Sequence, residues 1–192
     1  MKYLEPHKIV LIGASTGGPG HIKKILSSLT KSAKSTIVVA QHMGEEFIPS
    51  FIQQLNSSCL IKVEEVSNNK LLSASKVYVC TGKTSIESGS KGLYFKQVKI
   101  KLNHYNPDIN CLFTSGAKIT SKVQVLGIIL TGIGNDGAIG CKLLSEKGGE
   151  CVAESESTAI VNGMPLQAKK INQDIQILSI NKIISLINTW SE

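Results

Sequence analysis

The stretch IVLIGASTGGPGHIKKILSSLTKSAKSTIVVA, residues 9–40, decides the fold class. It opens with an apolar, β-branched run at 9–12, continues into a Gly-rich loop, and closes with a second apolar run at 36–40. Between the two runs, apolar side chains recur at helical spacing: Ile22, Ile25, Leu26 and Leu29. A strand, a loop, a helix and a second strand in this order normally give two parallel strands joined by a right-handed crossover.

The rest of the chain continues the same alternation. Apolar or alternating runs predict further strands at 60–66, 76–80, 123–130, 151–153 and 175–178. Helical spacing predicts helices at 45–56, 106–120, 137–148 and 164–170, and a terminal helix with Ile183, Ile184 and Ile187 facing the core. The segment 92–101 alternates after a Ser-Gly-Ser turn and predicts a hairpin. We therefore expect an α/β fold: a doubly wound, mostly parallel sheet with helices on both faces and a small antiparallel hairpin arm.

Length and charge limit the class of protein. The chain has 192 residues, so we expect 1–192 to form a single domain. Its formal net charge is +7, and every basic residue is Lys. Because sequence-specific readers of nucleic acid rely on the bidentate guanidinium of Arg, we expect no nucleic-acid partner. The scattered lysines favour a solvated surface, with a weak attraction for acidic protein partners as the alternative.

The cysteines and apolar runs bear on location. Five cysteines lie far apart without a C-x-x-C pair: Cys59, Cys80, Cys111, Cys141 and Cys151. This pattern predicts neither disulfides nor a zinc site, and it favours a reducing cytoplasm. The apolar run at 9–12 is too short for a signal peptide, and the longest run, at 125–130, is far below the roughly 20 residues of a membrane span. We expect a cytoplasmic protein without membrane insertion.

Three loops are the candidates for function. In doubly wound sheets, ligands bind beyond the carboxyl ends of the strands. The runs that look most like buried parallel strands end at Ile12, Ala40 and Leu130, and the loops after them read GASTGG, QHM and TGIGNDG. Catalytic or binding residues are therefore expected there.

The first loop contains G-x-S-x-G with Ser15 at its centre. On a sharp turn between a strand and a helix, such a serine exposes its hydroxyl, and the helix N-terminus supplies N–H groups for an oxyanion. A Gly-rich turn without chemistry and a phosphate cradle stay open as alternatives. Nucleotide motifs fit poorly, because Pro19 follows Gly18 where a Walker loop needs Lys, and the second strand closes on Gln41-His42 where a Rossmann fold has an acidic residue.

The second and third loops supply His42 and Asp136. His42 directly follows a strand expected to lie beside the first, so its imidazole could take the Ser15 proton. Asp136 could bond the far nitrogen of His42, and the glycines around it would let the Ile133 amide face an oxyanion. The alternative for Asp136 is an Asp-Gly turn that caps the helix from Ala138. The residues expected to position the oxyanion or the substrate are Thr16, Gly132 and Ile133.

The chain order of these residues disfavours one known hydrolase class. In α/β-hydrolases the order is Ser, acid, His, whereas here it is Ser15, His42, Asp136. The α/β-hydrolase order would require His104 and would leave the second and third loops unexplained, so we rank it lower.

Five stretches together carry a family resemblance: VLIGASTGGP (10–19), VVAQHM (38–43), NPDINCLFTSGA (106–117), ILTGIGNDGAIG (129–140) and AESESTAIVNGMP (153–165). In this order and spacing they resemble the catalytic domain of the CheB-type protein-glutamate methylesterase of chemotaxis. The resemblance implies a Ser-His-Asp triad of Ser15 as nucleophile, His42 as general base and acid, and Asp136 as the residue that orients it. It implies no metal and no organic cofactor.

The same resemblance implies a substrate and partners. The substrate would be the γ-methyl ester of glutamates on the cytoplasmic helices of methyl-accepting chemoreceptors, hydrolysed to glutamate and methanol, with deamidation of receptor glutamines by the same acyl chemistry. Members of the family commonly carry an N-terminal receiver domain, whereas here the first strand begins within ten residues of Met1. We expect either an isolated catalytic part or a stand-alone enzyme, regulated by a receiver protein in trans.

Two departures from the family pattern concern substrate contacts. The family often has a His shortly after the strand that ends here at Cys80, and a different polar residue where Thr114 stands. Reaction type is thus better predicted than substrate choice. The alternatives are a serine hydrolase of another ester, and a non-catalytic module that binds receptors or a nucleotide.

Overall fold

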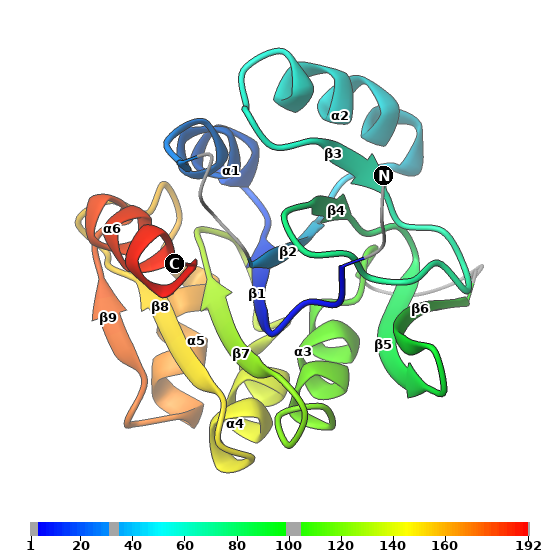
Figure 1. Cartoon of the computed structure of the whole chain (residues 1–192). Coiled ribbons are helices and arrows are strands. Elements are labelled where there is room, and N and C mark those ends of the chain that lie inside the picture. The colour runs from blue at the N-terminus through cyan, green and yellow to red at the C-terminus, as the bar shows by residue number, and fades with distance from the viewer. Residues whose placement is uncertain (1–3, 31–34, 99–104, 192) are drawn as a thin grey trace.

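Seven strands form the central sheet of the chain (Figure 1). The computed structural model describes residues 4–30, 35–98 and 105–191. The strands are β1 (Lys8–Ala14), β2 (Thr36–Gln41), β3 (Val63–Glu65), β4 (Val77–Val79), β7 (Gln124–Ile129), β8 (Glu150–Glu154) and β9 (Gln176–Leu178). Their order is β3-β4-β2-β1-β7-β8-β9, and every adjacent pair is parallel. The three strands from which the site was predicted are therefore neighbours, with β1 in the middle.

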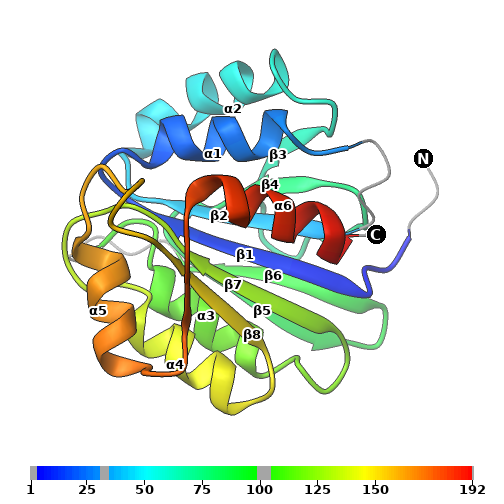
Figure 2. The ribbon, with the colours of Figure 1, turned by 90° about the vertical axis from the view of Figure 1, so that its left-hand side faces the viewer.

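Helices cover both faces of the sheet, so the doubly wound prediction is confirmed (Figure 2). The helices of one face are α1 (Gly18–Ser27), α2 (Ile48–Asn56) and α6 (Ile180–Ser191), and those of the other are α3 (Ile109–Ala117), α4 (Ala138–Glu146) and α5 (Gly163–Ile171). On β1, Val10 and Ile12 pack in the core of the first face, and Ile9 and Leu11 in that of the second. Burial on both sides explains why this strand is continuously apolar.

The predicted hairpin arm is a separate pair of strands beside the main sheet. Strand β5 (Lys83–Gly89) pairs antiparallel with β6 (Gly92–Val98). The arm packs on α3, where the Ile86 N–H donates to Ser115 Oγ at 2.9 Å. The predicted extension of this arm to 99–101 lies outside the described residues.

Several element boundaries differ from the predictions for local reasons. The strand predicted at 60–66 covers only Val63–Glu65, because the Asn56 side chain pairs with both backbone groups of Val63 at 2.9 Å and the residues before it leave the sheet. The helix predicted from 106 begins at Ile109, because Asp108 caps it by accepting from Cys111 N at 2.7 Å. The segment predicted as one helix at 45–56 divides into a 3₁₀ turn, η1 (Glu45–Phe47), and α2. In the terminal helix, Ile183 and Ile187 are fully buried and Ile184 is half-buried.

Within the described part of the chain, no helix is long and apolar enough to cross a membrane. All five cysteines are free thiols.

Candidate active site

The candidate site lies where β1, β2 and β7 end. These carboxyl ends meet at the same edge of the sheet, at the left of Figure 2. Ser15 directly follows β1, and its N–H donates to the Thr131 carbonyl after β7 at 3.0 Å. His42 directly follows β2, and its N–H donates to the Ala14 carbonyl at 2.9 Å. Backbone bonds between neighbouring loops thus fix both residues at one edge.

The His42 ring is held by Asp136. His42 Nε2 lies 2.8 Å from Asp136 Oδ2, and the Asp136 side chain is only 1% exposed. Because an ionised carboxylate accepts and does not donate, this geometry places the proton on Nε2 and leaves Nδ1 as the acceptor of the ring. The His42 side chain is 13% exposed, so the ring borders the surface while its partner is buried.

Asp136 also accepts hydrogen bonds from backbone N–H groups. Its Oδ2 also accepts from Ile109 N, and its Oδ1 accepts from Asn110 N and Gly137 N, each at 2.9 Å. The carboxylate therefore receives two N–H groups from the first turn of α3. The residue that caps α4 is Gly137, in the left-handed conformation with a φ of 87°, and no side chain caps that helix. The sequence alternative, a cap of the helix from Ala138, thus describes Asp136 poorly.

The Ser15 hydroxyl makes no hydrogen bond to any of the described residues. Among the described residues, neither Ser15 Oγ nor His42 Nδ1 has a hydrogen-bond partner. The turn that presents Ser15 closes with a bond from Gly18 N to the Ser15 carbonyl at 2.8 Å, at the N-terminus of α1. Catalytic hydrogen bonds are often long in enzymes without substrate and shorten when substrate binds.

Thr16, Gly132 and Ile133, the residues expected near an oxyanion, differ in whether the backbone amide already has a hydrogen-bond acceptor. In the part of the chain that the structure describes, the amides of Thr16 and Ile133 have no protein acceptor, so both are available to an oxyanion. The Gly132 amide instead donates to the Val161 carbonyl at 2.9 Å. Gly132 provides space, because a Cβ there would lie 2.7 Å from the Cβ of Ser15.

A buried carboxylate that the sequence analysis did not identify supports this edge. Glu154, at the end of β8, is 1% exposed and accepts from Thr131 N at 3.0 Å and from Thr158 Oγ1 at 2.8 Å. His21 Nδ1 lies 3.1 Å from the same carboxylate. The Thr131 hydroxyl donates to the Thr16 carbonyl at 2.8 Å, so Glu154 braces the loop that contacts the serine turn. Two sequence signals pointed to it: its place at a strand end, and its position in the stretch 153–165 that resembles the family.

A second unexpected neighbour is Tyr105. Its ring stacks on the His42 ring, with centroids 5.1 Å apart and planes 11° from parallel. His104, the histidine of the α/β-hydrolase alternative, lies outside the described residues.

One cysteine near the site, Cys111 on α3, is a poor nucleophile. Burial, followed by the charge of Asp108, raises the pKa of the Cys111 thiol on α3. It is the thiolate that reacts, so this thiol stays in its unreactive form at neutral pH. Over the described residues, no group of three or more His, Cys, Asp or Glu side chains could hold a metal ion.

Comparisons with known proteins point to one family. A family model described as CheB methylesterase matches residues 10–187. The protein-glutamate methylesterase/protein-glutamine glutaminase of Salmonella typhi is 32% identical over 184 residues, which are 94% of this chain and 52% of that protein. The protein of the same name from Lawsonia intracellularis is 37% identical over 161 residues, which are 82% of this chain and 44% of that protein.

A solved structure is similar over nearly its whole length. The crystal structure of the Thermotoga maritima CheB methylesterase catalytic domain matches with a TM-score of 0.88 and 29% identity, covering 95% of this chain and 97% of that one. In contrast, the chain spans about half the length of the curated relatives it matches.

Proposed function

The chain belongs to the CheB methylesterase family, and from this premise we propose that it hydrolyses glutamate γ-methyl esters on the cytoplasmic helices of chemoreceptors. The observation that carries the proposal is the buried Asp136 bonded to His42, one strand away from the free hydroxyl of Ser15. The relatives named as protein-glutamate methylesterase/protein-glutamine glutaminase support the choice of ester.

The proposed reaction begins with attack by Ser15 Oγ on the ester carbonyl. His42 Nδ1 takes the hydroxyl proton and then gives it to the departing methanol, while Asp136 stabilises the imidazolium that forms. Positioned proton transfer of this kind typically contributes about 10² to 10⁴ in rate. Water then attacks the acyl-enzyme by the same route in reverse, leaving glutamate and free Ser15.

The oxyanion of each tetrahedral intermediate would lie between the amides of Thr16 and Ile133. Both amides are free of protein acceptors in the described chain, and the first precedes the N-terminus of α1. Donors in place before the reaction stabilise the developing charge without reorganising, which is commonly the largest electrostatic contribution to ester hydrolysis. The same acyl chemistry would deamidate glutamine, with ammonia leaving in place of methanol.

Exposed apolar side chains beside the serine favour a protein substrate over a small ester. Ile133 is 63% exposed and Ile160 is 67% exposed. Ile160 lies against the serine turn, because a Cβ on Gly17 would meet its Cβ at 2.7 Å. Exposed apolar residues around a reactive centre are typical of a contact surface for a partner, here the apolar residues beside a methylated glutamate on a receptor helix. Since those helices lie in the cytoplasm, we place the enzyme there.

The test is methanol release from chemoreceptor membranes methylated at their glutamates. We expect Ser15→Ala to lower release by a factor on the order of 10⁴ or more, because the nucleophile is gone. Ser90→Ala is the matched control, because Ser90 is an exposed serine in the turn of the hairpin arm, and it is expected to release methanol like the wild type.

Equal release by wild type and Ser15→Ala would reject Ser15 as the nucleophile. Hydrolysis of small p-nitrophenyl esters without any methanol release from receptors would instead indicate that the site hydrolyses another ester.

A further inference from the structure

Tyr105 covers one face of the His42 imidazole. The two ring centroids are 5.1 Å apart and the planes differ by 11°, so the rings are stacked rather than edge-on. Of the residues described by the structure, this is the aromatic ring that contacts His42. Asp136 holds the ring only at its Nε2 edge, so a contact on the face restricts a different motion.

The position of Tyr105 is fixed from several loops. Its hydroxyl donates to Asn135 Oδ1 at 3.3 Å, on the residue before Asp136. Gly134 allows this approach: it has a φ of 96°, and a Cβ there would lie 3.0 Å from the Tyr105 hydroxyl oxygen. The neighbouring Asn106 accepts from Gly82 N at 2.9 Å through Oδ1. The tyrosine is therefore anchored to the loop after β7, and its neighbour to the loop between β4 and β5.

These contacts have a chemical consequence for the triad. Rotation of the His42 ring would break its bond to Asp136 and change the direction in which Nδ1 faces. A stacked aromatic ring opposes that rotation, and its π face also attracts the positive charge that the imidazole gains when it takes a proton. The first effect restrains the neutral ring as well, whereas the second acts only on the imidazolium that exists during the reaction.

We propose that Tyr105 is a positioning residue for His42: it keeps the imidazole in the plane that bonds Asp136 and presents Nδ1 to Ser15, and it stabilises the imidazolium. The inference rests on the proposed Ser-His-Asp function of the same site. It adds a fourth side chain, from the segment before α3, to a triad supplied by the ends of β1, β2 and β7.

The test compares aromatic and aliphatic replacements. Tyr105→Phe keeps the stacked ring and loses only the hydroxyl, so we expect kcat within about twofold of the wild type. Tyr105→Leu keeps an apolar side chain but loses the π face, and we expect kcat to fall about tenfold, as for the loss of one aromatic stacking contact, with KM unchanged. Tyr94→Leu, on the hairpin arm, is the matched control for removing a half-buried tyrosine.

A second readout needs no protein substrate. The rate at which a small organophosphonate labels Ser15 depends on activation of the serine by His42, so it should fall in Tyr105→Leu and be restored in Tyr105→Phe. In the wild type, the Cε1–H NMR signal of His42 should also carry an upfield ring-current shift from Tyr105, which requires no variant to fold.

The outcomes separate this inference from the proposed function. If the wild type labels at Ser15 but Tyr105→Leu labels equally fast, or if Tyr105→Phe is as slow as Tyr105→Leu, the positioning role of the ring is wrong and the triad stands. A wild-type His42 signal without the ring-current shift also overturns the inference. If the wild type does not label at Ser15, the proposed function fails, and the inference fails with it.

Discussion

The Asp136 carboxylate has both a functional and a structural role. It binds His42, and it also accepts the N–H groups of Ile109, Asn110 and Gly137. Each carboxylate oxygen receives two donors, which uses the acceptor capacity of an ionised carboxylate. The residue that orients the histidine is therefore also the residue that ties α3 to the loop after β7, and its replacement should affect both activity and stability.

Replacement of Asp136 by Asn is expected to slow turnover by about 10³ to 10⁴, because the amide can donate to His42 and favour the wrong tautomer. It should also lower the free energy of unfolding by about 1 to 3 kcal/mol, because an NH₂ group would face backbone N–H groups in a buried site. Methanol release and urea unfolding measure the two effects.

Asp108→Asn is the matched control. Asp108 caps α3 through one bond to Cys111 N, and Asn is an equally good cap, so activity and stability should both be close to wild type. Full activity of Asp136→Asn would remove Asp136 from the mechanism.

At the scale of elements, the loops after β1, β7 and β8 brace one another. The Thr131 carbonyl accepts from Ser15 N, and the Thr131 amide donates to Glu154. The amide of Gly132 donates to Val161. These bonds hold the loop after β7, which contains Ile133, against the turn that contains Ser15. They require the backbone of Gly132 to lie close to Ser15.

Gly132→Ala tests that close approach. The added Cβ would lie 2.7 Å from Ser15 Cβ and 2.3 Å from Met164 Sδ; the methionine can move, but the serine turn cannot without displacing Ser15. A displacement near 1 Å commonly costs about 10²-fold in rate, so kcat should fall by about that factor.

Gly20→Ala provides the comparison, because a Cβ at Gly20 meets nothing within 4 Å. In helix α1 it should raise stability by about 0.5 to 1 kcal/mol and leave kcat unchanged. An undiminished kcat in Gly132→Ala would contradict the proposed packing at the serine.

The edge strand β3 has its own ionic anchor. Glu64 pairs with Lys70, with Lys76 at 3.1 Å and with Lys62 at 2.9 Å. The hydrogen bond from Lys70, helped by the other two lysines, lowers the pKa of Glu64 from 4.5 to about 2. Because the folded-state pKa is depressed, the stabilisation is complete above pH 4.5 and is lost as the pH falls toward 2.

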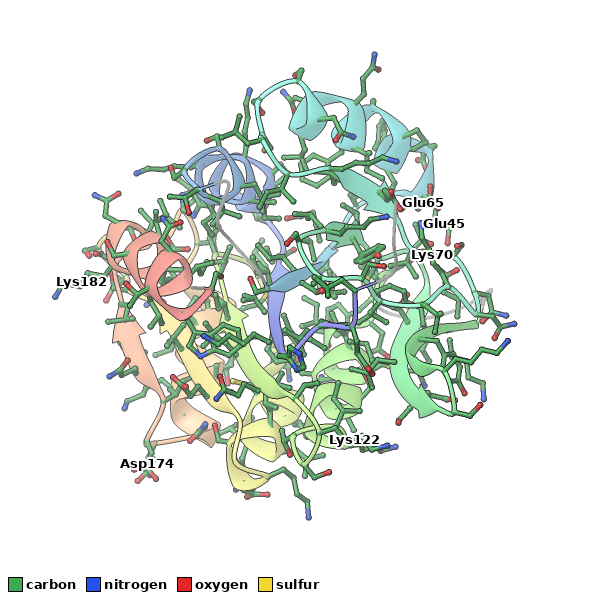
Figure 3. All side chains as sticks on the ribbon, viewed as in Figure 1. Glu45, Glu65, Lys70, Lys122, Asp174 and Lys182 are labelled. Carbon is green, nitrogen blue, oxygen red and sulfur yellow. The ribbon has the colours of Figure 1, made fainter. Side chains whose placement is uncertain are left out.

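Glu64→Gln should therefore lower the free energy of unfolding at pH 7 and reduce its decline between pH 4.5 and 2. Urea unfolding across this range is the measurement. Glu65→Gln, at the exposed neighbour in the same strand, should leave the profile of the wild type unchanged (Figure 3). If both variants retain the wild-type decline, the ionic anchor does not contribute to stability.

At the scale of the whole molecule, the doubly wound class and the three buried strands of the site could be predicted from the sequence. The runs at 9–12, 36–40 and 123–130 are apolar throughout because β1, β2 and β7 are covered on both faces, and such strands form the middle of a parallel sheet. That pattern was enough to place Ser15 and His42 at one edge.

Contacts between side chains of distant loops could not be predicted in this way. The bond of Asp136 to the first turn of α3, the stacking of Tyr105 on His42 and the role of Glu154 each join segments with no shared period or motif. Periodicity reports which face of an element is buried, but not which loop crosses it.

The charge of the molecule is spread rather than concentrated. Figure 3 shows Lys182 and Lys122 on different sides of the molecule, with Glu45 and Asp174 on others. The net charge of +7 therefore does not by itself define a binding face. Recognition of the substrate is better sought at the apolar residues around the serine, Ile133 and Ile160.

We propose that one serine at the carboxyl end of β1, Ser15, is the nucleophile of a Ser-His-Asp site. Its most direct test is peptide mapping by mass spectrometry after reaction of the whole chain with a serine-directed organophosphonate. We expect one modified peptide, with the phosphonate on Ser15, and loss of that modification in His42→Ala. Modification of a different serine, or none at Ser15 in an active preparation, would contradict it.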